Sequence, residues 1–261
     1  MIIRRASVSG YFYPNDKEDL KEQVIKLLNE SDAKNYVPKG LIVPHAGYIY
    51  SGSIAASAYR LLKKLSKKIT RVIIIGPSHR VSVQGVAVSN ADYFETPLGR
   101  LKVDTELRDK IIQETGIVLS EEAHRQEHCI EVQLPFLQMA LSDNIKILPA
   151  VVNNASYFEV SHFLNLVWNG PETLIVVSSD LSHYQTYENA KRLDESTAKA
   201  ITDFDLDSIR DDNACGSAAI KGFLMSSRER DLKPVLLDLR NSGDAVFEKD
   251  RVVGYGAFCF V

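Results

Sequence analysis

Three apolar segments that each run into a histidine-bearing turn are the feature that most constrains how this chain can fold. They are residues 41–43, 71–75 and 173–178, and short apolar runs of this kind are the pattern of buried strands. His45, His79 and His183 follow these runs within a few residues, after proline, glycine or serine. In open α/β sheets, ligands bind outside the carboxyl ends of the strands. The three imidazoles are therefore predicted to converge at one edge of a sheet.

The rest of the chain alternates between strand and helix patterns. Further strands are predicted at residues 83–88, 101–103, 145–152, 235–239 and 252–260. Helices are predicted at residues 20–28, 53–62, 107–114, 127–140, 157–168, 191–204 and 214–226. Such alternation is typical of a mixed, largely parallel central sheet with helices on both faces. Since no repeat or low-complexity linker divides the chain, we predict a single α/β domain over residues 1–261.

Charge and composition exclude several classes of partner. The net charge of −3 over 261 residues argues against a general nucleic-acid binder, because phosphate binding needs a basic surface. No apolar run reaches the ~20 residues of a membrane span, and no apolar stretch follows the charged N-terminus as in a signal peptide. Three cysteines do not form a disulfide framework in a chain of this length. We therefore expect a cytoplasmic protein without nucleic acid or membrane as partner.

Four of the six histidines occupy strand-end or helix-start positions, and this joint pattern weighs more than any one of them. A single histidine after a strand is more often a hydrogen-bonded turn residue than a metal ligand. His128, which follows Glu127, joins the three strand-end histidines as a candidate that lines the same cleft. A metal-capable cleft explains all four positions together.

Cys215 lies at the start of the helix predicted over residues 214–226. A helix N-terminus stabilises a thiolate, which is the form that binds metals or attacks electrophiles. Spacing supports equally the alternative that the small residues around Cys215 form a face for tight packing. Cys129 and Cys259 are predicted to be structural, the first in a helix and the second in the last strand.

Asp180 and Glu127 are the carboxylates nearest the histidines, and they could be ligands or acceptors that orient an imidazole. The alternative for both is helix capping. Tyr48 is a candidate for the mouth of the cleft, although such tyrosines are more often half-buried packing residues with the hydroxyl in water.

An ordered set of motifs makes this chain resemble the Memo family over nearly its whole length. The motifs are Arg4-Arg5-Ala6, Gly10-Tyr11-Phe12-Tyr13-Pro14, Pro44-His45-Ala46-Gly47-Tyr48, Gly76-Pro77-Ser78-His79, Glu127-His128-Cys129-Ile130-Glu131-Val132-Gln133-Leu134-Pro135-Phe136, Ser179-Asp180-Leu181-Ser182-His183 and Cys215-Gly216. The family looks like a structural relative of the class III extradiol ring-cleavage dioxygenases, which are non-haem iron enzymes. The resemblance therefore implies an α/β fold of the extradiol dioxygenase type.

The resemblance also implies roles for the site residues. It places metal ligands at His45 and His79, and it places Cys215 at the third-ligand position, where the dioxygenases have a carboxylate. His183 takes the place of the acid–base histidine, with Asp180 beside it as a second catalytic candidate. A thiolate makes the site softer than the usual His-His-carboxylate face of iron oxygenases. Iron or copper is the expected cofactor, with zinc as a further candidate, and classical ring cleavage is disfavoured.

Three functions fit these observations, and the first is a metal-dependent oxidoreductase in which His183 moves protons beside the metal. The second is a non-enzymatic module that binds a peptide or small ligand in a vestigial dioxygenase cleft, with the helix N-terminus at Cys215 as an anion site. The third is a metal-free hydrolase with Cys215 as nucleophile, His183 as base and Asp180 as orienter. We rank them in this order. The resemblance further implies a functional link to a radical-SAM protein.

Overall fold

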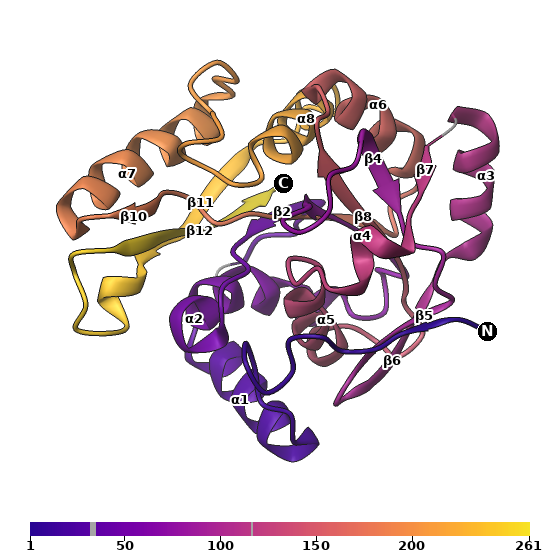
Figure 1. Ribbon diagram of the computed structural model, residues 1–261, viewed down its shortest axis with the longest axis horizontal. Helices are drawn as coiled ribbons and strands as arrows, with labels where there is room; N and C mark the ends of the chain where they lie inside the picture. The colour runs from indigo at the N-terminus through magenta and orange to yellow at the C-terminus, as the bar shows by residue number, and fades with distance from the viewer. Residues whose placement is uncertain (32–34, 116) are drawn as a thin grey trace.

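One mixed sheet of twelve strands forms the centre of the computed structural model, which describes residues 1–31, 35–115 and 117–261. The strand order is β1-β5-β6-β8-β3-β9-β2-β12-β10, with β11 paired to β12 and with β4 paired to β7 and β8 (Figure 1). The strands are β1 (Ile3–Arg4), β2 (Gly40–Val43), β3 (Arg71–Pro77), β4 (Gly85–Val88), β5 (Tyr93–Thr96), β6 (Gly99–Val103), β7 (Val118–Leu119), β8 (Lys146–Asn153), β9 (Thr173–Ser178), β10 (His183–Gln185), β11 (Pro234–Asn241) and β12 (Val252–Phe260). The helices are α1 (Lys17–Glu30), α2 (Tyr48–Tyr59), η1 (Arg60–Leu65), α3 (Thr105–Thr115), α4 (Glu121–Arg125), η2 (Glu131–Gln133), α5 (Leu134–Ala140), α6 (Tyr157–Val167), α7 (Tyr187–Asp203), α8 (Ser217–Arg228) and η3 (Ser242–Asp244).

The central strands β6, β8, β3, β9 and β2 run parallel to one another, which confirms the largely parallel sheet. Strand β9 lies between β3 and β2, and its last residues pair with the last residues of both neighbours. Val177 is level with Ile75 in β3, and Ser178 is level with Val43 in β2. Because the three strands end side by side, the turns that follow them share one edge of the sheet.

Two separate cores cover the two faces of the sheet. Successive residues of a strand point to opposite faces, so Val72 and Ile74 of β3 enter one core while Ile73 and Ile75 enter the other. Helices α1, α2 and α5 pack on the first face, and α6, α7 and α8 pack on the second (Figure 1). Strands that are buried on both faces read as continuous apolar runs, which is why these segments show no polar alternation. The prediction of helices on both faces is confirmed.

The segment at residues 127–140 differs from its predicted helix. Only η2 and α5, which begin at Glu131 and Leu134, are helical. The carboxylate of Glu127 accepts the backbone N–H groups of His128 and Cys129 at 2.9 and 3.0 Å. A side chain that captures its neighbours' amides in this way holds the backbone in a turn and competes with helix formation. Cys129 therefore lies in a buried turn and not in a helix.

Other elements also depart from the sequence prediction, and the short elements β1, β7, β10 and α4 were not predicted. Strand β5 was not predicted, and it forms an antiparallel hairpin with β6 across the turn that ends at Gly99. The last helix begins at Ser217, with Gly216 as its N-cap residue, so that Cys215 precedes it. Within the described ranges, no helix combines the length and apolar character that a membrane span requires.

Candidate metal centre

His45 follows β2, and a chain of hydrogen bonds determines which of its ring nitrogens carries the proton. The side chain is buried, and its Nδ1 lies 2.9 Å from Ser178 Oγ. The Ser178 hydroxyl donates its single proton to the carbonyl of Cys129 at 2.7 Å. Ser178 Oγ therefore accepts from His45, so Nδ1 carries the proton and Nε2 presents a lone pair. This is a tautomer that can bind a metal.

Gln133 completes the network beneath His45. Its amide nitrogen donates to Ser178 Oγ and to the Pro44 carbonyl, each at 2.9 Å, and its Oε1 accepts the Tyr59 hydroxyl at 2.9 Å. A buried polar network of which every member is satisfied is rigid and holds its side chains in one arrangement. Sequence reasoning missed Ser178 and Gln133 as site residues. The available signal was that both are polar residues within segments that are otherwise apolar.

His79 follows β3, and the carboxylate of Glu127 holds it by two contacts. Glu127 Oε2 accepts the backbone N–H of His79 at 2.7 Å, and Oε1 lies 2.9 Å from His79 Nδ1. Burial alone would raise the pKa of Glu127, but the hydrogen bonds and the charge of His79 lower this pKa to about 2. Glu127 is therefore an ionised acceptor for the proton on Nδ1, and Nε2 of His79 is available to a metal.

His128 completes a cluster of three imidazoles. One ligand nitrogen from each of His45, His79 and His128 lies within 4.8 Å of the other two. The ring centroids are 4.7 to 5.3 Å apart. Burial, followed by the charge of a neighbouring histidine, lowers the pKa of His45 to about 3 and that of His128 to about 4. Both rings are therefore neutral at pH 7. The structure brings the predicted pair His45 and His79 together, and it places His128, predicted only to line the cleft, at ligand range.

Cys215 approaches the cluster at His45. Its Sγ lies 3.4 Å from His45 Nε2. On a tetrahedral cation, metal bonds of about 2.3 Å to sulfur and 2.0 Å to nitrogen place the two donor atoms about 3.5 Å apart. The observed separation is close to that of two ligands on one ion, and without a metal it is also the distance of a thiol–imidazole hydrogen bond. Cys215 lies outside the tight group of three nitrogens, so the sulfur is a fourth donor at the side of His45.

The helix start predicted at Ala214 is wrong by three residues, because α8 begins at Ser217, and this changes the environment of the Cys215 thiol. Cys215 lies before the N-cap residue, and its backbone N–H donates to the Asp180 carbonyl at 3.3 Å. Burial, followed by the negative charge of Asp180, raises the pKa of Cys215 to about 12. The expected stabilisation of a thiolate by the helix N-terminus is therefore not found. Without a cation beside it, Cys215 is a neutral thiol.

Cys215 is expected to alkylate slowly in metal-stripped protein. A pKa of about 12, in place of the ordinary 9.0, makes the thiolate about a thousand times scarcer at neutral pH. Iodoacetamide labelling between about pH 7 and 10, mapped by mass spectrometry against N-acetylcysteine in the same tube, should give a rate that is still rising at the upper limit. A plateau below about pH 9 would contradict this and would favour the metal-free hydrolase.

Asp180 and His183 follow β9 and lie near the histidine cluster. Asp180 Oδ1 accepts the backbone N–H of His45 at 2.7 Å. Burial raises the pKa of Asp180, opposed by that hydrogen bond and by the charge of His183. His183 is half-buried in β10, and it is close enough for its charge to lower the pKa of His45 as well. The edge thus places a buried carboxyl with a raised pKa near a second imidazole.

Tyr48 does not line the cleft, contrary to prediction. Its hydroxyl donates to the Val132 carbonyl at 2.7 Å, and its ring packs against Tyr13 and Phe136 in the core. Tyr48 is the first residue of α2 and is buried. Phe12 is the aromatic residue at the site, because its ring centroid lies 4.9 Å from that of His128. Local sequence could not separate these residues, since both lie in aromatic motifs.

A cavity of about 350 Å³ gives access to the cluster, since His79 and Cys215 both line it. Asn153, Asn154, Asp211 and the residues at the start of α8 form much of the remaining wall. Its volume falls within the range of small-molecule sites, roughly 300–1,000 Å³. A substrate in this cavity would lie against one of the imidazoles and the thiol.

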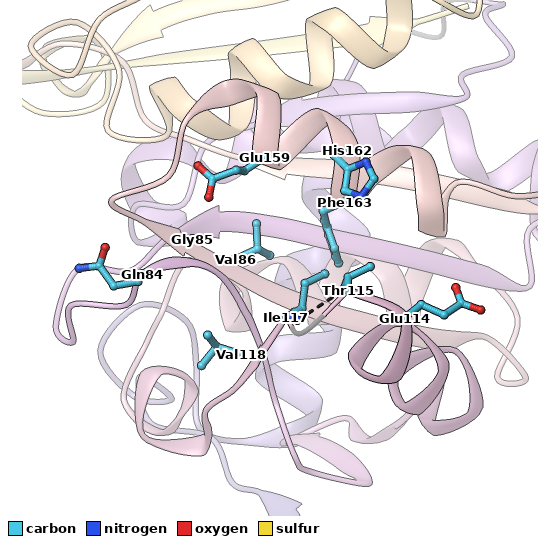
Figure 2. Close-up of a pocket in the computed structure, with 10 residues that line it drawn as sticks. All are labelled: Gln84, Gly85, Val86, Glu114, Thr115, Ile117, Val118, Glu159, His162 and Phe163. Carbon is cyan, nitrogen blue, oxygen red and sulfur yellow. Dashed lines mark hydrogen bonds between the residues drawn. The ribbon is translucent and has the colours of Figure 1, made fainter.

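A second hollow, of about 420 Å³, lies between β4, α3 and α6 (Figure 2). Figure 2 shows Glu159 and His162 of α6 at its upper side, and Val86 of β4 with Ile117 and Val118 below them. The Glu159 carboxylate is bound to Ser156 in the capping box of α6. None of the predicted site residues lines this hollow, so the candidate site is the histidine cluster.

Comparisons with known proteins find relatives that match nearly the whole chain. A family model described as Memo-like protein matches residues 4–259. A MEMO1 family protein of Aquifex aeolicus is 35% identical over 271 residues, and the match covers 100% of both chains. A MEMO1 family protein of Methanosarcina mazei is 35% identical, with 98% of each chain covered. The crystal structure of an uncharacterized Escherichia coli K12 protein is similar at a TM-score of 0.55 and 12% identity, over 84% of this chain and 99% of that one. This last likeness is one of fold alone.

Proposed function

Because this chain belongs to the Memo family, we propose that it is a metal-dependent redox protein with a non-haem metal centre in a single α/β domain. His45, His79 and Cys215 are the proposed ligands, and His128 is a further imidazole within ligand range. Iron or copper is the proposed metal, and zinc is the non-redox alternative. Imidazole donors suit all three metals, and a thiolate favours the softer ones.

One observation carries this proposal: two independent networks leave the same ring nitrogen available on two histidines. The Ser178 hydroxyl accepts from Nδ1 of His45, and the Glu127 carboxylate accepts from Nδ1 of His79. Metal-binding histidines almost always donate their second ring N–H to such a partner, which fixes the orientation of the ring. A pair of histidines that only packs in a turn would not need this support.

Bound iron or copper would supply electron transfer at this site, and the chain itself would supply the proton chemistry. The buried carboxyl of Asp180 accepts the backbone N–H of His45, and its proposed role is to position the turn that carries this ligand. His183 is less buried and is the proposed group that exchanges protons with a substrate. An oxygen of Glu127 also lies within ligand range of His79 and Cys129, but Glu127 is proposed as the acceptor that orients His79, because its two oxygens accept from the backbone and the ring of that residue. With no carboxylate ligand, classical ring cleavage is not proposed.

Removal of either histidine is expected to abolish metal binding. Wild-type protein, loaded with Fe(II) or copper and dialysed, should retain about one metal ion per chain, and His79→Ala and His45→Ala should retain about tenfold less or lower. Elemental analysis after dialysis measures this. His79→Ala is the safer variant for folding, because its side chain is partly exposed.

His162→Ala is the matched control, since His162 is exposed on α6 in the hollow of Figure 2 and lies outside the cluster. Retention of metal by both cluster variants at the wild-type level would overturn the proposal.

A parallel comparison of Cys215→Ser with His128→Ala identifies the third ligand. The third ligand is the residue whose replacement causes the larger loss of bound metal. Our proposal requires Cys215→Ser to lose more metal than His128→Ala.

A binding module for a peptide or small ligand is the second candidate function. The observation in its favour is the cavity of about 350 Å³ beside Cys215, which is large enough for a ligand without any metal. This function predicts that a ligand found by screening binds equally well before and after metal is stripped. Binding that requires the metal would count against it.

A further inference from the structure

A groove on the outer side of the His79 turn carries an excess of positive charge. It has a volume of about 760 Å³ and lies between the N-terminal segment and the segment that contains α4. Arg5, Arg80 and Arg125 line it, and Glu121 is its one carboxylate. This concentration of guanidinium groups contrasts with the net charge of −3 for the whole chain.

Among the described residues, the three guanidinium groups have no ion-pair partner. All three residues are exposed, and within the described part of the chain no carboxylate lies within ion-pair distance of Arg5, Arg80 or Arg125. The one carboxylate of the groove is already engaged, because Glu121 Oε2 accepts the Ser89 hydroxyl at 2.8 Å. Like charges that line one hollow repel each other, so the groove favours a ligand that brings negative charge.

The wall of the groove is held firmly even though its arginine side chains are exposed. Arg4, which also lines it, is buried and is paired with Glu131 beneath the surface. Arg4 also donates to the carbonyls of Arg5, His124 and Glu127 at 3.1, 3.1 and 2.6 Å. These bonds join the two walls, so the backbone that carries Arg5 and Arg125 is preorganised. A preorganised site loses less conformational entropy when a ligand binds.

We propose that this groove binds a small phosphoryl compound with two or more negative charges, of the diphosphate type. Guanidinium groups match phosphoryl oxygens by paired, charge-assisted hydrogen bonds, and three such groups around one hollow suit an ion with several oxygens. A single carboxylate would leave most of these donors unused. The site is separate from the histidine cluster, although Arg80 adjoins His79 and Gln126 adjoins Glu127 in the chain.

Isothermal titration of the full-length protein with inorganic diphosphate, at constant ionic strength, tests the proposal. We expect one saturable site with a Kd of about 1 mM or tighter, and about tenfold weaker binding in each of Arg5→Ala, Arg80→Ala and Arg125→Ala. Arg192→Ala is the matched control, because Arg192 is exposed on α7 outside the groove. Its affinity should equal that of the wild type. Thermal melting confirms that each variant is folded.

Titrations of His45→Ala with diphosphate, and of the wild type with citrate, separate the groove from the histidine cluster and from unselective anion binding. Unchanged diphosphate affinity in His45→Ala, together with the losses in the arginine variants, supports the groove. Loss of binding in His45→Ala with retention in the arginine variants would place the anion at the histidine cluster and overturn the proposal. Equal losses in Arg192→Ala, equal affinity for citrate, or no saturable binding of diphosphate would each overturn it as well.

Discussion

Replacement of Glu131 by alanine is expected to lower the free energy of unfolding by about 3–5 kcal/mol, because it leaves a buried charge without its partner. The Glu131 carboxylate is fully buried and accepts from five donors. They are the Arg4 guanidinium, the backbone N–H and hydroxyl of Ser7, the backbone N–H of Val8 and the hydroxyl of Tyr13. Burial alone would raise the pKa of Glu131, but Arg4 and these donors lower it, so the group is ionised.

Urea unfolding at neutral pH, with Glu22→Ala on the exposed face of α1 as control, measures the loss. The control should differ from the wild type by less than about 0.5 kcal/mol. The double variant Arg4→Met, Glu131→Leu, which removes both charges, should recover part of the stability. A loss below about 1 kcal/mol in Glu131→Ala would show that water or other groups solvate Arg4, contrary to this arrangement of donors and acceptor.

Replacement of Glu127 by glutamine is expected to weaken metal binding by about 10–100-fold. The carboxylate accepts from the ring and backbone of His79 and from the backbone N–H groups of His128 and Cys129. A glutamine amide offers one acceptor oxygen in place of two and brings donors toward groups that are themselves donors. The His79 ring should then lose its fixed tautomer and orientation, and the turn that carries His128 should loosen.

Competition with a chelator of known affinity measures the change, and Glu122→Gln on the exposed side of α4 is the matched control. The control should bind metal as the wild type does. Thermal melting of metal-free protein separates the two consequences, since Glu127→Gln should also melt at a lower temperature. Unaltered metal affinity in Glu127→Gln would mean that the carboxylate serves the backbone turn alone and does not orient a ligand.

Much of the fold could be predicted from local sequence because the informative signals are local. The runs that became β2, β3 and β9 are buried on both faces, and burial on both faces favours apolar residues at successive positions. Each apolar run is followed within a few residues by a histidine, so the positions of His45, His79 and His183 after strand ends were also predictable, although β3 continues through Gly76 and Pro77, where a turn was predicted. The hairpin strand β5 was missed, because its alternating burial is weak over only four residues.

The properties of the site residues were harder to predict from the sequence. A thiol in a short run of small residues looks the same in sequence whether it begins a helix or precedes one, and only the bond from Cys215 to the Asp180 carbonyl decides this. Tyr48 and Phe12 likewise lie in similar aromatic motifs, yet the one packs in the core and the other beside His128. The environment that sets each pKa comes from distant segments.

The sequence alone determined the family, the sheet with helices on both faces and the candidate donors, because each of these is encoded by residue types at short spacing. The tertiary structure decided which candidate metal-donor atoms lie close together. Strand β9 lies between β3 and β2, and this brings Asp180 to His45 across 135 residues. The tertiary structure likewise decided that Glu127 supports His79 across 48 residues, and that Cys215 is a buried thiol. Tautomers, desolvation and donor separations depend on atoms from remote segments, and only the packed chain brings these atoms together.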